Sequence, residues 1–464
     1  MDIKNFKHEK LLISRFSTEP GEFWCIYGEN HSGIDSFVAL FSGDLKNYTA
    51  SRLHIPEDPG LLSFKLQQDI FEEELRNDNT DFIDRIDPGT PAKNFLPHYK
   101  NHLSLIHALG MTDYLDLGYR QLSSGQCRKL LLLKKILEGS THIILQNPYD
   151  GLDEKSCKEL DHALKHLIRS GIELLLIVSS VIDIPHWCTH LAIISEGRMI
   201  HQDLMVQALP LCTGLQAAKM DSRWSDDIKQ TQRVNSSRNK PLIILRNGFA
   251  GYGGKKLFHG LDLIISPGDH TLITGPNGCG KSTLLDIITG DNPKCYANEL
   301  IIFGKKRGTG ESIWDIKKHM GLVSPSLHRD HRVPGSALQI VLSGFFDSIG
   351  LYQKASDQQI RTARRWIYRI GLQGEESRSF RELSHADQRL ILIARAVIKL
   401  PRLLILDEPT QGLDDLNKNR LLSLLESIAG LNISTIIFVS HRKDEYRPFF
   451  RQHIELSNYS LAPR

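Results

Sequence analysis

The sequence predicts an α/β fold built twice in tandem, with a mixed, mostly parallel sheet and a helical subdomain in each copy. Short Val/Ile/Leu runs, such as residues 174–178 and 403–406, alternate with longer segments of helical period, a pattern typical of parallel sheets surrounded by helices. The same landmarks also occur twice at a fixed distance. At 464 residues, the chain is moreover too long to fold around a single core.

The repeat is visible in four pairs of positions. LSSGQ at 122–126 and LSHAD at 383–387 are 261 residues apart. Three further pairs keep this offset: the end of an apolar run (Gln146 and Asp407), the last residue of a GLD triplet (Asp153 and Asp414), and the residue after a second apolar run and a serine (Ser180 and His441). Upstream, GENHSG from position 28 matches GPNGCG from position 275 at an offset of 247. The second copy therefore has 14 more residues between these two motifs.

This repeat predicts three segments. Residues 1–205 form the first domain and residues 241–464 the second. Residues 206–240 are rich in polar residues and poor in strand pattern, so we expect a linker with some helix at its start.

The stretch around which the second copy is organised is GPNGCGKST, between the apolar run 270–274 and the helix-like run 284–289. Its glycines allow the loop to wrap a phosphate chain, and the helix that follows directs its positive end there. Lysine adds a charge for the β and γ phosphates, and serine a hydroxyl for Mg²⁺. The alternative is a glycine-rich turn without a ligand. The predicted nucleotide contacts are Gly275, Pro276, Asn277, Gly278, Cys279, Gly280, Lys281, Ser282 and Thr283.

With LDEPTQGLD at 406–414, these landmarks resemble the ATP-binding-cassette (ABC) ATPase family over nearly the whole chain. Residues 251–269, 289–317 and 321–332 are similar to the tandem ModF/PhrA-type proteins, which are named for molybdate transport or photorepair. The resemblance implies two tandem P-loop nucleotide-binding domains that use ATP and Mg²⁺.

It also implies roles in the second copy. Asp407 holds Mg²⁺ together with Ser282, Glu408 polarises the attacking water, and His441 contacts the γ-phosphate. Lys281 completes the catalytic set. Tyr252, 23 residues before the loop, is placed to stack on adenine, although a surface turn tyrosine is the alternative.

The first copy lacks these groups. Ile34 and Asp35 stand where the lysine and the metal-binding hydroxyl are expected. Gln146 and Asn147 replace the acidic pair, and Ser180 replaces the histidine. We therefore expect no hydrolysis at this copy, with nucleotide binding there left open.

The LSSGQ motif of the first copy is nevertheless intact. A serine that begins a helix and a glycine that allows close approach can form a second anion site from Ser123, Ser124, Gly125 and Gln126. In the family, two cassettes pack head to tail and each such motif closes the phosphate loop of the other. The resemblance thus implies one active composite site, supported by Asp153, and one degenerate site, where Ala386 replaces glycine.

Two features depart from the family pattern or leave choices open. Residues 320–326 contain no glutamine where the family has its Q-loop, so we expect slow turnover. In the first copy, either Gln67 or Gln68 fits that position. His328 and His331 have H-x-x-H spacing but no paired carboxylate or cysteine, so we expect no zinc site.

Composition limits the partners. The net charge of +3 gives no bulk field for nucleic acid, which makes a nucleic-acid partner unexpected. No apolar stretch approaches the roughly 18 residues of a membrane span, and the N-terminus lacks a secretory signal. An odd number of cysteines, seven, without a C-x-x-C pair suits reduced thiols. We expect a cytoplasmic protein, peripheral on the inner face of the cell membrane where it joins integral subunits.

The predicted function is the ATPase component of an ABC transport system, of molybdate type by resemblance. The alternative is a soluble tandem ABC switch that regulates a partner or a nucleic-acid process. A weaker third alternative is a nucleotide-binding scaffold without hydrolysis. The two halves are expected to close on each other within one chain or across a homodimer.

Overall fold

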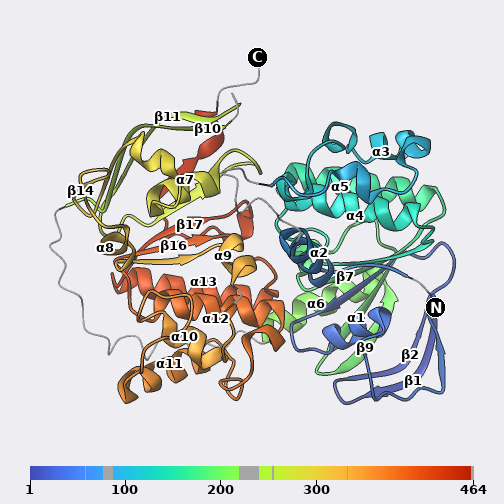
Figure 1. Cartoon of the computed structure of the whole chain (residues 1–464). Helices are drawn as coiled ribbons and strands as arrows, with labels where there is room; N and C mark the ends of the chain where they lie inside the picture. Colours follow the sequence, from blue (N-terminus) through green and yellow to red (C-terminus); the bar gives the residue numbers. More distant parts are fainter. Residues whose placement is uncertain (58, 77–86, 219–239, 253–254, 332, 461–464) are drawn as a thin grey trace. The chain divides into compact units, whose positions relative to one another are not determined.

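The computed structural model describes residues 1–57, 59–76, 87–218, 240–252, 255–331 and 333–460. They form two compact units: Met1–Met220 with Gly412–Asn417, and Asp221–Gln411 with Lys418–Arg464 (Figure 1). The predicted linker begins with helix α6 (Met205–Ala218), in which Ala208 and Cys212 are buried in the core of the first unit. Linker residues 219–239 lie outside the described part, and the three predicted boundaries stay predictions.

The first unit contains one nine-stranded sheet with the order β4-β1-β2-β9-β8-β3-β7-β6-β5. The strands are β1 (Asp2–His8), β2 (Leu11–Ser17), β3 (Trp24–Gly28), β4 (Arg52–His54), β5 (Gly60–Leu62), β6 (His142–Gln146), β7 (Glu173–Val178), β8 (His190–Ser195) and β9 (Arg198–Leu204). Strands β8, β3, β7, β6 and β5 run parallel, whereas β1 and β2 form an antiparallel pair.

Helices cover both faces of this sheet. They are α1 (Ile34–Ser42), α2 (Phe64–Arg76), α3 (Leu103–Ala108), α4 (Ser124–Leu137), α5 (Glu154–Arg169) and α6. Alternate residues of β3 enter different cores: Trp24 and Ile26 pack with α1 and the β1–β2 pair, whereas Cys25 and Tyr27 pack with α4, α5 and α6. A strand buried on both faces reads as a continuous apolar run, here WCIYG.

The second unit, coloured yellow to red in Figure 1, divides its strands between two sheets. The antiparallel sheet has the order β11-β10-β13-β14 and the parallel sheet the order β15-β16-β17-β12-β18. The strands are β10 (Ile243–Tyr252), β11 (Lys255–Ile265), β12 (Thr271–Thr274), β13 (Glu299–Ile302), β14 (Lys305–Lys306), β15 (Met320–Val323), β16 (Leu403–Asp407), β17 (Thr435–Val439) and β18 (Gln452–Glu455).

Its helices are α7 (Lys281–Thr289), α8 (Ile313–Lys317), α9 (Pro325–Asp330), α10 (Ala337–Ser343), α11 (Asp357–Arg369), α12 (His385–Val397) and α13 (Asp415–Gly430). One core joins α7 to both sheets through residues such as Leu284, Ile273 and Leu261. Serine caps start the helices of the helical subdomain, where Ser336 and Ser356 each form a capping box.

These two units confirm the predicted α/β class. Within the described residues, no helix is both long enough and apolar enough to cross a lipid bilayer.

Candidate functional site

The carboxyl edge of the parallel sheet in the second unit gathers the predicted site residues. Strand β12 ends at Thr274, immediately before the phosphate loop, and pairs in parallel with β17. Strand β16 ends at Asp407, which is in register with Val439, the last residue of β17. Since all three strands point the same way, the residues that follow them lie along one edge, where α/β sheets bind ligands.

The phosphate loop requires its glycines. Gly275, Gly278 and Gly280 have φ of 142°, 78° and 101°, values that other residues rarely adopt. A Cβ on Gly275 would lie 2.8 Å from the Sγ of Cys279. The loop therefore folds tightly around its own interior and leads directly into the N-terminus of α7.

Lys281 lies inside this loop. Its side chain is only 6% exposed, and its Nζ donates hydrogen bonds of 2.8 and 3.1 Å to the carbonyl oxygens of Gly275 and Pro276. Cys279 is also buried, and burial raises the pKa of its thiol. A buried ammonium surrounded by loop backbone provides the positive charge that a phosphate chain needs.

Ser282 and Asp407 meet as the sequence predicts for a metal site. The Ser282 hydroxyl donates a 2.8 Å hydrogen bond to Oδ2 of Asp407. Burial, together with the neighbouring Glu408 charge, raises the pKa of Asp407 to about 6, although Ser282, Arg389 and Lys281 oppose the shift. A hydroxyl and a carboxylate are oxygen donors of the kind Mg²⁺ prefers, so the residues present fit that ion.

Glu408 and His441 form a direct pair: Nδ1 of His441 lies 3.2 Å from Oε1 of Glu408. Burial pushes the pKa of Glu408 upward, but the hydrogen bond from His441 and the charges of His441, Lys281 and Arg389 outweigh it, so the pKa is lowered. The backbone of Glu408 has a φ of 46°, and its N–H donates to the carbonyl of Val439. This strained turn presents an ionised carboxylate beside the phosphate loop.

Arg389 is a residue that the sequence reasoning missed. It is 1% exposed, and burial lowers its pKa to about 10. Its guanidinium donates to four carbonyl oxygens, those of Ser324, Asp407, Glu408 and Pro409. It thus holds the turn that carries both carboxylates. The first copy has an arginine, Arg128, at the same 261-residue offset, and this repetition could have identified Arg389 from the sequence. Arg128 donates a 2.7 Å hydrogen bond to the carbonyl oxygen of Pro148.

Three other candidates are placed as follows. Tyr252 is the last residue of β10, and its side chain lies outside the described part. Gln67 and Gln68 both lie in α2, so the choice between them stays open. In the second unit, Ser324 follows β15 where a glutamine was expected, and its hydroxyl accepts from the N–H of Leu327.

His328 and His331 join a buried cluster. The His328 ring stacks on His385 at 4.5 Å, and its Nε2 lies 2.9 Å from Oε1 of Gln388. His331 packs edge-on against Phe380. Among the described residues, no three His, Cys, Asp or Glu side chains are placed to bind one metal ion.

The first copy keeps the backbone of this site and replaces its chemistry. Asn147 has a φ of 43° and donates its N–H to Ile177, as Glu408 does to Val439. Ile34, at the position of the lysine, is 4% exposed, and its Cδ1 would lie 2.7 Å from a Cβ on Gly28. An apolar side chain therefore occupies the inside of this loop. Asp35 is exposed in the first turn of α1, where the second copy has its serine.

The two LS motifs also differ. In the first copy, Ser123 and Gln126 form a capping box at the start of α4, with distances of 2.9 and 3.3 Å. In the second copy, the Ser384 hydroxyl donates a 2.7 Å hydrogen bond to the carboxylate of Asp387. The N-terminus of α12 thus carries the negative charge of Asp387, and the Ser384 hydroxyl proton is already hydrogen-bonded to that carboxylate. The first turn of α4 carries no acidic residue.

The remaining residues of the first motif are placed as follows. Gly125 allows close packing, since a Cβ there would lie 2.9 Å from Leu152. Ser124 begins α4, and its side chain lies outside the described part. Asp153 caps α5, because its carboxylate accepts a 2.8 Å hydrogen bond from the N–H of Ser156. The nucleotide and metal roles of all these residues stay predictions.

Comparisons with known proteins agree with this architecture. Residues 258–411 match the ABC transporter family. The chain is 34% identical over 446 residues to the ABC transporter ATP-binding protein ModF of Escherichia coli (strain K12), which covers 94% of this chain and 91% of the relative. It is 31% identical over 207 residues to the molybdate import ATP-binding protein MolC of Haemophilus influenzae, which covers 45% of this chain and 75% of the relative. A solved structure of ribosome-bound archaeal Pelota and ABCE1 shares the fold, with a TM-score of 0.62 at 15% identity, over 98% of this chain and 75% of that chain.

Proposed function

Because the chain belongs to the ABC transporter ATP-binding family, we propose that it hydrolyses ATP to ADP and phosphate at a single site built on its second copy. One observation carries the proposal: the second unit gathers Lys281, the Ser282–Asp407 pair and the Glu408–His441 pair at one sheet edge. At the matching positions, the first copy has Ile34, Asp35, Gln146 and Asn147. At the position of His441 it has a serine, which is Ser180 by sequence spacing and Ser179 by strand register.

In the proposed mechanism, the glycine loop and Lys281 bind the phosphates, and Tyr252 stacks on adenine. Ser282 and Asp407 hold Mg²⁺, which neutralises charge on the phosphate oxygens when it is bound. Glu408 accepts the proton of the attacking water, a task suited to a carboxylate whose lowered pKa keeps it ionised. His441, within 3.2 Å of Glu408, orients that carboxylate and contacts the γ-phosphate.

The proposed site is composite. Ser123, Ser124, Gly125 and Gln126 of the first copy close the loop at 275–283, with support from Asp153. The neutral start of α4 suits an anion, whereas Asp387 at the start of α12 would repel one. The competent loop and the competent LS motif therefore belong to one site, and their degenerate counterparts to the other. The absence of a Q-loop glutamine at Ser324 supports slow turnover.

The proposed biological role is the ATPase subunit of a transporter, with molybdate as the suggested substrate. Support comes from the names of two relatives, an ABC transporter ATP-binding protein and a molybdate import ATP-binding protein. Integral-membrane subunits are the proposed partners, with peripheral association at the inner face of the cell membrane. Nucleic acid is not a proposed partner.

The test has two parts. Purified chain should hydrolyse ATP only with Mg²⁺, and the native protein should co-purify with integral subunits from detergent-solubilised membranes. An active protein recovered without membrane subunits would favour the soluble switch. A purified chain that does not hydrolyse ATP would overturn the enzymatic proposal.

A further inference from the structure

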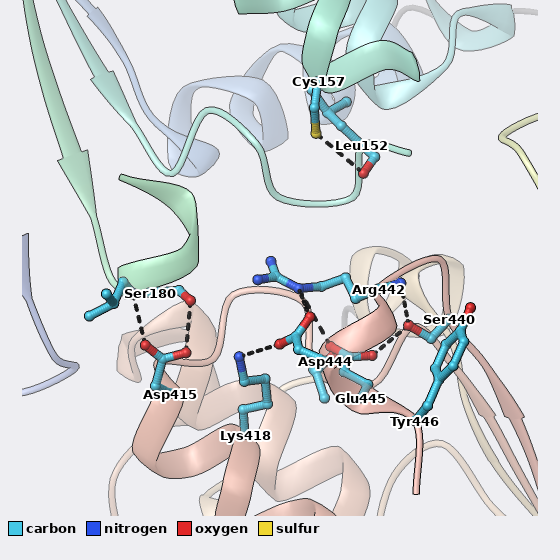
Figure 2. Close-up of polar contacts among 12 residues, drawn as sticks. Leu152, Cys157, Ser180, Asp415, Lys418, Ser440, Arg442, Asp444, Glu445 and Tyr446 are labelled. Atoms are coloured by element: carbon cyan, nitrogen blue, oxygen red, sulfur yellow. Dashed lines mark hydrogen bonds and ion pairs between the residues drawn. The ribbon is translucent and has the colours of Figure 1, made fainter. Parts of the chain in front are cut away.

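A buried carboxylate outside the predicted site connects its two catalytic loops. Glu445, in the 3₁₀ turn after the His441 loop, is 1% exposed. One of its oxygens accepts from the hydroxyl of Thr410. The other accepts from the hydroxyl of Ser440 at 2.5 Å, as Figure 2 shows. Thr410 lies two residues after Glu408, and Ser440 lies one residue before His441. Glu445 therefore joins the turn that carries Glu408 to the loop that carries His441.

A second layer of charges surrounds this connection. Arg442 donates its backbone N–H to the Ser440 hydroxyl at 2.9 Å, and its Nε lies 3.3 Å from Asp444 (Figure 2). Lys418 on α13 donates a 2.7 Å hydrogen bond to the carboxylate of the same aspartate. These ion pairs fix the short segment 440–445, which leaves the Glu445 carboxylate directed at its two hydroxyl donors.

The first copy makes the corresponding connection differently. At the 261-residue offset, Tyr149 replaces Thr410. The 3₁₀ turns Val181–Asp183 after β7 and Lys443–Glu445 after β17 correspond, so that Asp183 stands at the position of Glu445 and Val178 at the position of Ser440. Ser179, which the strand register matches to His441, donates both its N–H and its hydroxyl to Oδ1 of Asn147, at 3.0 and 3.2 Å. The residue at the position of the catalytic carboxylate is thus itself used to hold the loop, and Tyr149 donates to Asp161 instead.

The comparison of the two copies indicates what Glu445 does in the second copy. A loop tied to residue 408 itself would occupy the carboxylate that the reaction needs. With Glu445 in place, the tie runs through Thr410 and Ser440, and the Glu408 side chain keeps its pairing with His441. The first copy forms the same 3₁₀ turn although Tyr149 and Val178 stand at the positions of the two hydroxyl donors, so this connection is not required for the fold.

We infer that Glu445 is a positioning residue for ATP hydrolysis, which holds His441 and Glu408 in reacting register by binding the hydroxyls of Ser440 and Thr410. The inference rests on the proposed hydrolysis at the second copy. Small displacements of catalytic groups cost on the order of 100-fold in rate, whereas the phosphate loop does not touch Glu445 in any described hydrogen bond. Loss of the carboxylate should therefore lower kcat and leave ATP binding unchanged.

The test compares Glu445→Gln with wild type and with Glu426→Gln, the same chemical change at a carboxylate that pairs with Arg447 on the surface. We expect kcat of Glu445→Gln to fall about 10- to 100-fold, with KM for ATP changed less than about twofold, and Glu426→Gln to match wild type. Thr410→Val removes one of the two donors and should lower kcat in the same direction, which provides a second variant if Glu445→Gln unfolds.

A double-mutant cycle separates positioning from a merely structural role. In a His441→Ala background, the effect of Glu445→Gln should shrink below about twofold, since the register it maintains no longer matters. Unchanged kcat in both Glu445→Gln and Thr410→Val, or the same fold-loss with and without His441, would overturn the inference while hydrolysis by wild type still stood. Wild type without ATPase activity would overturn both the proposed function and this inference.

Discussion

The imidazole Nδ1 of His441 lies 3.2 Å from the carboxylate Oε1 of Glu408, although the two residues are 33 positions apart in the sequence. The contact follows from topology, since β16 and β17 are parallel neighbours and end in register at Asp407 and Val439. It keeps the Glu408 carboxylate ionised in a buried place, where burial alone would favour the protonated form.

Glu408→Gln should abolish hydrolysis and preserve nucleotide binding. The amide keeps the shape of the side chain but cannot accept a proton from water, so we expect kcat to fall by about 100-fold or more. The dissociation constant for ATP should remain close to that of wild type because the phosphate loop is unchanged. Asn147→Asp at the matching position of the first copy, which retains an acceptor for Ser179, should leave kcat unaltered. Substantial hydrolysis by Glu408→Gln would remove this residue from the mechanism.

Lys281→Ala and Ile34→Ala should have opposite kinds of effect. Loss of the ammonium inside the second loop should lower kcat/KM by about 100-fold or more. Ile34 packs in the core of the first unit, so its truncation should cost about 2–4 kcal/mol of stability and leave activity per folded molecule nearly intact. Steady-state kinetics with thermal unfolding checks both. Equal kinetic losses would end the asymmetric interpretation.

Ser123→Arg should stop hydrolysis, whereas Ser384→Arg should not. In the proposed composite site, a bulky side chain at the start of α4 would keep the first LS motif away from the phosphates. Ser384 belongs to the motif whose hydroxyl already binds Asp387, and it faces the degenerate site in this scheme. ATPase rates of the two variants measure the difference. Full activity of Ser123→Arg would show that the first copy does not close the active site.

The second unit should be destabilised by acid. Burial, with the charge of Arg389 or Arg395 nearby, lowers the pKa of His328 and of His331 to about 4, and burial places the pKa of His385 well below its ordinary value. In the unfolded chain, these histidines bind protons at about pH 6.5. The contribution of these buried neutral histidines to the free energy of unfolding is therefore fully present above about pH 6.5. It is lost progressively as the pH falls towards 4, because the unfolded state binds more protons than the folded state.

Urea unfolding at pH 7.5 and pH 5.0 checks this prediction. His331→Leu provides the control, since the buried Nε2 of His331 has no hydrogen-bond partner among the described residues. The substitution therefore removes a titrating group and breaks no described bond at that atom. The loss of stability between the two pH values should be smaller in His331→Leu than in wild type. An equal loss would exclude His331 as a source of the acid sensitivity.

Much of this architecture could be predicted from the chain. The fixed offset of 261 residues identified the repeat, and apolar runs such as 403–406 became central strands because strands buried on both faces need continuous hydrophobic sequence. The glycines of the phosphate loop could be recognised because few other residues adopt their backbone angles. The replacements at Ile34 and Asn147 were equally visible as changes of charge and hydrogen-bonding capacity.

Other features depended on the tertiary structure. The sequence alone did not show that Arg389 binds four carbonyl oxygens or that Glu445 joins two loops, because these contacts connect segments that only parallel strand pairing brings together. Sequence thus determined which chemical groups each copy has, since identity and spacing are local properties. The tertiary structure decided which of those groups meet, since burial and strand register act across distant parts of the chain.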